Sequence, residues 1–334
     1  MTEIAHLHRR PFPGSFSIER LFKGIRLKLS DHGVHVNELV APRFSKGIVS
    51  RIQNIQWAKT LRADVFHVTG DIHYVTLGMT AEKTVLTIHD LEMLTRSKGL
   101  RRKLLKTFWF DLPLNRVAAV TVISEATKEK LLSLVDLDPT IVRVIPNFVD
   151  PRFEFVCYPS LDAPPRILLL GTKANKNLER TIQALQNIDC NIDIVGRLSD
   201  HQRQLLVECG NTFKNHVGIS DDELIGLYRN CCVVCFASTE EGFGLPIIEA
   251  QATGRPVVTS NCSSMPEVAG TGAILVDPHD VDSISVGIQK ALSDRECRQQ
   301  LIHNGLKNCK RFQLESVAAQ YADLYQFVVA QNAK

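Results

Sequence analysis

Two glutamates eight positions apart flank a glycine-rich turn in the stretch EEGFGLPIIEAQATGRPVV, residues 240–258. Gly242 and Gly244 let the backbone turn sharply and approach a ligand closely. Pro246 suits the start of a helix, because the N–H that proline lacks has no helical partner there. The N–H groups and the positive dipole end of such a helix favour a phosphate or a sugar rich in oxygen.

The carboxylates of Glu241 and Glu249 could each hold one sugar. A carboxylate can accept two hydrogen bonds from a vicinal diol, which a ribose and several transferred sugars offer. The spacing puts Glu249 at the end of the first helical turn and Glu241 before the glycines, so the two reach a ligand from different directions. The residues alone leave a second interpretation open, in which Glu249 complements the helix dipole and Glu241 is a solvated loop charge.

The elements that must position these residues follow an alternating pattern. In the second half, short apolar runs such as RILLLG (166–171), NIDIVG (191–196) and CCVVCFAS (231–238) alternate with helical patterns. Apolar strands with helices between them predict a parallel sheet that is covered on both faces. The first half repeats this pattern, with strands expected at 64–70, 84–90, 118–124 and 141–147 and helices at 17–33 and 125–135.

Prolines in residues 151–165 predict a linker between two domains. We therefore expect an α/β protein with two doubly wound, Rossmann-like domains, at 1–155 and 165–314. A helix at 315–334 could pack back on the first domain. Two such domains would face a central cleft, where the carboxyl ends of their strands would bind ligands.

Composition restricts the cellular setting. No apolar run approaches the roughly 20 residues of a membrane helix, and the N-terminal sequence lacks the apolar segment of a secretory signal, so we expect a cytoplasmic protein. All nine cysteines follow residue 150 and several lie in apolar runs, which predicts reduced thiols. The CVVC sequence (232–235) matches the spacing of a redox motif, but it lies in an expected strand, which favours a structural role. Residues 1–150 carry 22 Lys and Arg against 15 Asp and Glu, which favours an anionic partner for this half.

The segment 96–114, RSKGLRRKLLKTFWFDLPL, places six basic residues before three aromatic ones. It suits peripheral contact with an anionic membrane, or an amphipathic helix packed in the first domain with its charged face in water. We expect no nucleic acid partner, because no recognised motif accompanies this charge. We also expect no catalytic metal, since the DLDP turn (136–139) follows a helix and no His or Cys spacing suits zinc.

The stretch EGFGLPIIEAQATGRPVVTSN closely resembles the donor-site signature of the family-4 retaining glycosyltransferases of GT-B fold, whose E-x7-E pair is here Glu241 and Glu249. ILLLGTKANKNLERTIQAL, TIHD and MPEVAGTGAILVDP also resemble family segments, so the likeness covers most of the chain. It implies retaining transfer of a hexose from a nucleoside diphosphate sugar to a hydroxyl of a glycan or lipid-linked oligosaccharide. The setting would be bacterial surface polysaccharide assembly, such as lipopolysaccharide O-antigen or capsule, at the inner face of the cytoplasmic membrane, with no cofactor.

The resemblance also assigns roles to residues. Glu249 would hold the ribose, Glu241 and the backbone of the turn would address the donor sugar, and Lys176 would bind the phosphates. The family's phosphate-binding Arg is replaced here by Thr172 and Lys173, which leaves the second cation unidentified. The predicted catalytic residues are Glu241, His89 and Lys176. The predicted donor-binding residues, in domain 165–314, are Gly171, Thr172, Lys173, Lys176, Arg197, Val217, Gly242, Phe243, Gly244, Leu245 and Glu249. The predicted acceptor-binding residues, in domain 1–155, are His67, Asp71 and Asp90.

Two other functions fit a chain of this kind. One is a catalytically inactive scaffold that binds a sugar nucleotide. The other is an epimerase or phosphorylase of GT-B shape, which would need additional acid and base residues or a pyridoxal cofactor.

Overall fold

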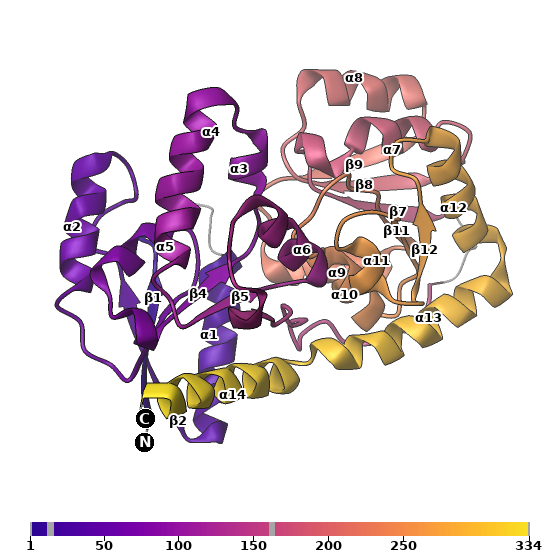
Figure 1. The fold of residues 1–334 in the computed structure, drawn as a ribbon. Coiled ribbons are helices and arrows are strands. Elements are labelled where there is room, and N and C mark those ends of the chain that lie inside the picture. The colour runs from indigo at the N-terminus through magenta and orange to yellow at the C-terminus, as the bar shows by residue number, and fades with distance from the viewer. Residues whose placement is uncertain (1, 12–16, 160–163, 333–334) are drawn as a thin grey trace. The chain divides into compact units, whose positions relative to one another are not determined.

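The computed structural model describes residues 2–11, 17–159 and 164–332, and the chain divides into two compact units (Figure 1). Unit 1 holds Met1–Phe148 and Leu314–Lys334, and unit 2 holds Val149–Gln313. Each unit has a sheet of six strands, and all strand pairs are parallel. The predicted α/β class with two parallel sheets is confirmed.

The sheet of unit 1 has the order β2-β1-β3-β4-β5-β6, so the strand order reverses between β1 and β3. Its strands are β1 Thr2–His8, β2 Val34–Val40, β3 Val65–Val68, β4 Thr84–Ile88, β5 Ala119–Val122 and β6 Val142–Val144. Its helices are α1 Ser17–Leu29, α2 Ile48–Ala58, α3 Glu92–Arg96, α4 Gly99–Leu105, α5 Leu112–Leu114, α6 Glu125–Leu134 and α14 Leu314–Asn332. Short turns are η1 Ser30–His32, η2 His73–Gly78, η3 Ala81–Lys83, the π-helical η4 Lys106–Asp111 and η5 Pro139–Ile141.

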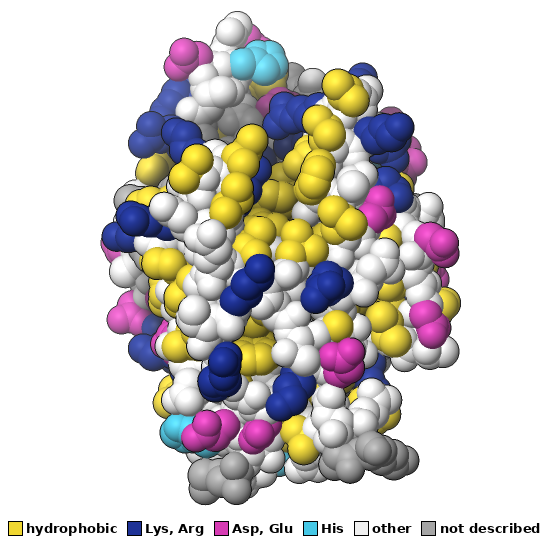
Figure 2. All heavy atoms as spheres, turned by 60° about the vertical axis from the view of Figure 1, so that its left-hand side comes forward, with side chains coloured by type: hydrophobic (Ala, Val, Ile, Leu, Met, Phe, Trp, Pro, Cys, Tyr) yellow, Lys and Arg dark blue, Asp and Glu magenta, His cyan; other side chains and the backbone are white. Residues whose placement is uncertain are grey.

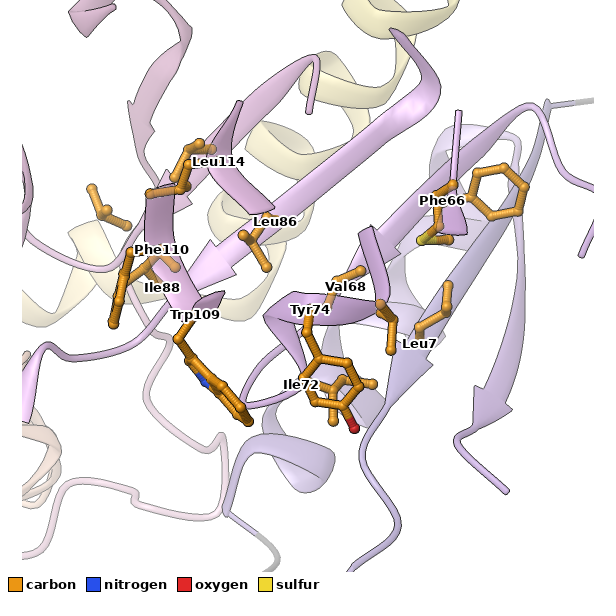
Figure 3. Packing of buried hydrophobic residues seen from close by; sticks show 14 of the residues in the cluster. Leu7, Phe66, Val68, Ile72, Tyr74, Leu86, Ile88, Trp109, Phe110 and Leu114 are labelled. Atoms are coloured by element: carbon orange, nitrogen blue, oxygen red, sulfur yellow. The ribbon is translucent and has the colours of Figure 1, made fainter. Parts of the chain in front are cut away.

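Two apolar clusters cover the two faces of this sheet, because successive strand residues point to opposite sides. In β4, Leu86 and Ile88 join one cluster and Val85 joins the other. The first cluster also contains the aromatic rings of Trp109 and Phe110 (Figure 3). The second contains buried residues of α1 and α14, so the C-terminal helix belongs to unit 1.

Buried histidines on the α14 side of the sheet share one tyrosine hydroxyl. The Tyr325 oxygen lies 2.8 Å from His6 Nε2 and 2.6 Å from His67 Nδ1, and His67 Nε2 lies 2.7 Å from the Thr87 hydroxyl. Burial lowers the pKa of both histidines well below its usual value, so both rings are neutral at pH 7. The helix that covers this face therefore supplies one hydrogen-bond partner to both rings through Tyr325.

The sheet of unit 2 has the order β12-β11-β10-β7-β8-β9 and reverses between β10 and β7. Its strands are β7 Arg166–Leu170, β8 Asn191–Val195, β9 Thr212–His216, β10 Val233–Phe236, β11 Val257–Ser260 and β12 Ala273–Val276. Its helices are α7 Leu178–Ala184, α8 Asp200–Cys209, α9 Asp221–Asn230, α10 Leu245–Ala252, α11 Met265–Ala269, α12 Val281–Ser293 and α13 Arg295–Cys309, with short turns η6 Ala174–Lys176 and η7 Lys310–Phe312.

The change from unit 1 to unit 2 lies at Phe148–Val149, ahead of the proline-rich segment expected as the linker. The buried Arg255 explains the difference, because its guanidinium donates to the carbonyls of Val156 and Cys157 at 3.1 and 3.0 Å. The described part of the proline-rich segment is thereby fixed to unit 2.

The sequence did not predict seven elements: β1, β2, β9, α2, α3, α11 and α13. The inner strand β1 contains His6 and His8, and these polar residues interrupt the apolar run that would have identified a buried strand. The edge strands β2 and β9 are only partly buried, and β9 reads TFKNH, so they lack the apolar run that marks an inner strand.

We predict that Tyr325→Phe lowers the free energy of unfolding of unit 1 by about 1–3 kcal/mol, because two buried histidines lose a hydrogen-bond partner. Both tryptophans, Trp57 and Trp109, belong to unit 1, so urea unfolding followed by tryptophan fluorescence measures this unit. Nucleotide binding by unit 2 should stay at the wild-type level. An unchanged urea midpoint would show that the hydroxyl does not stabilise the sheet.

Candidate functional site

The polar loops of unit 2 meet where its strand order reverses. Open α/β sheets bind ligands at such a point, outside the carboxyl ends of the strands. The loop after β7 runs through Gly171 to Asn177, and the loop after the neighbouring strand β10 runs through Ser238 to Gly244. The two loops are joined directly, since the Thr239 N–H donates to the Asn175 carbonyl at 2.8 Å and the Asn175 side chain donates to the Glu240 carbonyl at 3.1 Å.

The predicted turn lies at this point and leads into α10. Gly244 has φ +105°, in the region that favours glycine, and Pro246 follows in the first turn of the helix. The Ser264 hydroxyl lies 2.8 Å from the Phe243 carbonyl and 3.1 Å from the Glu241 carbonyl, which fixes the turn from the β11 side. The positive end of the α10 dipole is thus directed to the loops at the strand reversal.

Lys176 and Glu241 form an ion pair across the two loops. Lys176 Nζ lies 2.7 Å from Glu241 Oε1, and the Asn175 amide donates to the same oxygen at 3.3 Å. The two side chains are 22% and 14% exposed, so a ligand can reach the pair while water screens it only in part. The ammonium group also lies 4.7 Å from the centre of the Phe236 ring, a cation–π contact.

Backbone geometry holds Lys176 in this position. Gly171 has φ +90°, and a Cβ built there would lie 2.7 Å from Lys176 Cγ, so the lysine stem packs directly over the glycine. Asn177 also has a positive φ, +56°, and its amide donates to the carbonyls of Ala237 and Pro278 at 3.0 and 2.6 Å. The loop after β7 is therefore fixed on both sides of the cation.

Glu249 lies one turn into α10 beside a buried tyrosine. The Tyr228 hydroxyl donates to Glu249 Oε2 at 2.6 Å, and the tyrosine is fully buried. Burial raises the pKa of Glu249 to about 7, although the hydrogen bond from Tyr228 and the charge of Lys176 act in the opposite direction. Such a carboxyl changes its charge close to neutral pH, and Tyr228 fixes only one of its two oxygens.

Other predicted donor residues differ in what their side chains can do. The Thr172 hydroxyl donates to the Arg197 carbonyl at 2.8 Å, which ties the loops after β7 and β8 together. The side chains of Lys173, Arg197 and Val217 are exposed. Phe243 is only 4% exposed and its ring packs edge-on against Phe312, so only its backbone is available to a ligand. Leu245 is the first residue of α10.

The predicted residues of unit 1 lie around one pocket, apart from His67. A pocket of about 630 Å³ is lined by His89, Asp90 and Asp71, together with Arg9 and residues of α2, α3, α4 and η4. His89 Nε2 lies 2.7 Å from the Thr69 carbonyl and must carry the proton, because a carbonyl only accepts. Burial lowers the pKa of His89, so Nδ1 is an acceptor at neutral pH.

His67 requires a correction. The sequence placed it among acceptor-binding residues because it ends a strand, but the structure buries it completely, with its nitrogens bonded to Tyr325 and Thr87. A side chain enclosed between sheet and helix cannot contact an acceptor. We therefore assign His67 to the core of unit 1.

Three polar residues that the sequence did not single out help to form these sites. Arg9 follows β1 and forms an ion pair with Asp71 after β3, at the strand reversal of unit 1. Asn175 and Tyr228 contact the two predicted glutamates of unit 2. A βα pattern beginning at residue 2 would have indicated Arg9, whereas the tyrosine contact depends on packing of α9 against α10 and leaves no motif.

Two further findings concern metals and membranes. Among the residues that the structure describes, no cluster of three His, Cys, Asp or Glu side chains could hold a metal ion. None of the described helices is long and apolar enough to cross a bilayer. Independence from a metal remains a prediction.

Comparisons with known proteins agree with the fold. Residues 6–153 match the family model described as Glycosyltransferase Family 4, and residues 162–308 match the model described as Glycosyl transferases group 1. Sucrose-phosphate synthase from Thermosynechococcus elongatus has a similar structure, with a TM-score of 0.81 over 99% of this chain and 100% of that chain at 18% identity. HepE from Anabaena, solved with UDP and glucose, has a TM-score of 0.77 over 98% and 100% of the chains at 16% identity.

The two models together span most of the chain, which belongs to the family-4 glycosyltransferases of GT-B fold. The O-antigen chain mannosyltransferase B of Escherichia coli is 28% identical over 272 residues, which are 74% of this chain and 71% of that relative. The chain spans 56% and 41% of two further relatives, which are also named mannosyltransferases.

We predict that affinity for a nucleoside diphosphate falls about tenfold as the pH is lowered from 8 to 6, with a midpoint near 7, because Glu249 becomes protonated. Glu249→Gln should bind more weakly at pH 8 and lose this pH dependence, which calorimetric titration measures. The nucleotide's own titration is common to both proteins and cancels. Identical pH profiles would exclude Glu249 as the titrating contact.

The same substitution should stabilise the protein without nucleotide. The folded pKa of Glu249, about 7, lies above its usual 4.5, so the buried carboxylate costs stability increasingly as the pH rises from 4.5 to 7. At pH 8, Glu249→Gln should raise the free energy of unfolding by about 1–3 kcal/mol in chemical denaturation. A loss of stability at pH 8 would contradict the assigned direction of the pKa shift.

Tyr228→Phe removes the hydroxyl that orients Glu249 and leaves the ring in place. We predict a loss of about threefold to tenfold in nucleotide affinity at pH 7.5 and a higher midpoint in its pH profile, since this hydrogen bond lowers the pKa of Glu249. A weaker affinity with an unchanged midpoint would indicate a packing effect instead.

Proposed function

We propose that this protein is a retaining glycosyltransferase that moves a hexose from a nucleoside diphosphate sugar to a hydroxyl of a glycan or lipid-linked oligosaccharide. A mannosyl donor is favoured by the names of the relatives. The observation that carries the proposal is the Lys176–Glu241 ion pair at the strand reversal of unit 2, beside the α10 N-terminus and Glu249.

The ion pair supports a division of labour. A bound diphosphate would replace Glu241 as the partner of Lys176, which frees the carboxylate to accept hydroxyl groups of the sugar. Negative charge develops on the leaving diphosphate in the transition state, and Lys176 with the N–H groups of the turn would stabilise it. Glu249 would hold the ribose, and His89 would contact the transferred sugar. This charge arrangement needs no metal ion and no cofactor, and the proposal assigns no protein nucleophile.

The proposed acceptor contacts are Asp71 and Asp90 in the pocket of unit 1. We further propose that the enzyme works in the cytoplasm at the inner face of the membrane, in assembly of a surface polysaccharide such as O-antigen or capsule. This part rests on the basic segment 96–114 and on the names of the relatives.

Turnover with UDP-, GDP- and dTDP-sugars in the presence of EDTA and crude lipid-linked glycans tests the proposal. We expect release of nucleoside diphosphate and a product with the donor's anomeric configuration, read by proton NMR. Lys176→Met should lower kcat/KM by about 100-fold to 1,000-fold, comparable to loss of one oxyanion-stabilising group. Glu241→Gln should lower kcat more than nucleotide affinity, and Lys290→Met, an exposed lysine of α12, should leave both unchanged.

Other outcomes would contradict the proposal in distinct ways. Tight sugar-nucleotide binding without turnover of any donor would indicate an inactive scaffold. Conversion of the donor without an acceptor would indicate an epimerase, and a product of inverted configuration would exclude retention. Loss of activity in EDTA that Mg²⁺ restores would contradict independence from a metal.

A further inference from the structure

Helix α4 exposes a row of large apolar side chains. None of its seven residues, all of which the structure describes, is buried. Leu100, Leu104 and Phe108 are 73%, 50% and 54% exposed, and their spacing of four puts them on one side of α4 and η4. Trp109 and Phe110 point into the core instead. Segment 96–114 thus has an end packed in the core of unit 1 and a beginning that exposes apolar side chains.

Helix α2 exposes a second apolar group. Ile48, Val49 and Ile52 are 74%, 69% and 48% exposed at the beginning of the helix, whereas Asn54 and Ala58 are buried. Asn54 holds the preceding loop in place, because its amide bonds to the backbone N–H and carbonyl of Arg43 at 3.1 and 3.0 Å. The exposed group is therefore carried by a well-anchored helix.

The two groups lie on either side of the unit 1 pocket. Ser45 in the loop before α2 and Arg51 in α2 line one side of the pocket. Arg96, Arg101 and Leu105 line it from α3 and α4. The Arg51 guanidinium lies 4.6 Å from the centre of the Trp109 ring, which links α2 to η4. Figure 2 shows this side of unit 1, with ridges of hydrophobic side chains and Lys and Arg side chains beside and between them.

The charge around these groups is mainly positive, although Glu92 and Asp111 form ion pairs with Arg96 and Lys106. Residues 41–60 contain four Lys or Arg, residues 93–110 contain six, and neither range contains an Asp or Glu. Exposed apolar ridges within a cationic rim suit a surface that offers both hydrocarbon and anionic groups, as an anionic bilayer does. A second copy in a two-fold dimer would place two surfaces of net positive charge against each other, which disfavours self-association.

We infer that α2 and α4–η4 together form a docking surface for an anionic lipid bilayer, placed around the mouth of the unit 1 pocket. We call it the membrane face, and its apolar members are Ile48, Val49, Ile52, Leu100, Leu104 and Phe108. The inference deepens the proposed function and rests on it for the role of the pocket. A lipid-linked acceptor would then reach Asp71 and Asp90 from the bilayer surface, without leaving the membrane.

Co-sedimentation with vesicles tests this surface. The full chain should bind vesicles of phosphatidylcholine mixed with phosphatidylglycerol, bind pure phosphatidylcholine much more weakly, and lose affinity as salt is raised from about 0.1 M to about 0.5 M. The triple variant Ile48→Ser, Val49→Ser, Ile52→Ser should bind the mixed vesicles about tenfold or more weakly, as should Leu100→Ser with Leu104→Ser. The matched control is Val207→Ser with Val286→Ser, which removes two valines of unit 2 that are 70% and 62% exposed.

The α2 variant decides the inference, because contact through α4 alone would leave its vesicle binding at the wild-type level and would overturn the two-helix surface. A change in oligomeric state in light scattering, without a change in vesicle binding, would assign this face to a second copy and would also overturn it. Nucleotide affinity and turnover of a soluble acceptor should be unchanged in both variants. If vesicle binding depends on α2 but the protein has no transferase activity, the proposed function is contradicted and the docking surface is supported.

Discussion

Each sheet of this protein reverses its strand order at one point, and the proposed chemistry depends on that constraint. The crossovers from the two strands at the reversal run to opposite faces, so their following loops have an open crevice between them. In both units an ion pair joins these loops, Arg9–Asp71 after β1 and β3 and Lys176–Glu241 after β7 and β10. Charged side chains are thus concentrated at the carboxyl ends of the strands, where a ligand can reach them and they are not buried in the core.

The ion pair of unit 2 shows how the site remains stable without its ligand. Lys176 packs over Gly171, whose missing side chain gives it room, and forms an ion pair with Glu241, so the cation is held in place without a ligand. Glu249 lies deeper and is fixed by Tyr228 through one oxygen only. A preorganised cation and a carboxylate with one oxygen left for a ligand would suit the charged leaving group and the ribose diol of the proposed donor.

Most of unit 2 could be predicted from the sequence, because its strands are continuous apolar runs and the turn before α10 has a recognisable pattern of glycine, proline and glutamate. Less of unit 1 could be predicted, because His6 and His8 interrupt the apolar pattern of β1 and the edge strand β2 lacks an apolar run. His67 was wrongly assigned to the acceptor site because its position in the sequence does not show which helix covers it. That helix is α14, which comes from the C-terminal end of the chain. Tyr228 was missed because its contact with Glu249 depends on tertiary packing, whereas Arg9 was missed because the strand before it was not recognised.

The central claim is that Lys176 holds the diphosphate of the donor. It is tested most directly by calorimetric titration of the wild type and Lys176→Met with a nucleoside diphosphate and the monophosphate of the same base, in EDTA. The account predicts that the wild type prefers the diphosphate by about tenfold or more, equivalent to about 1.4 kcal/mol, and that the variant loses most of this preference while it still binds the monophosphate. An equal preference in the two proteins would contradict it.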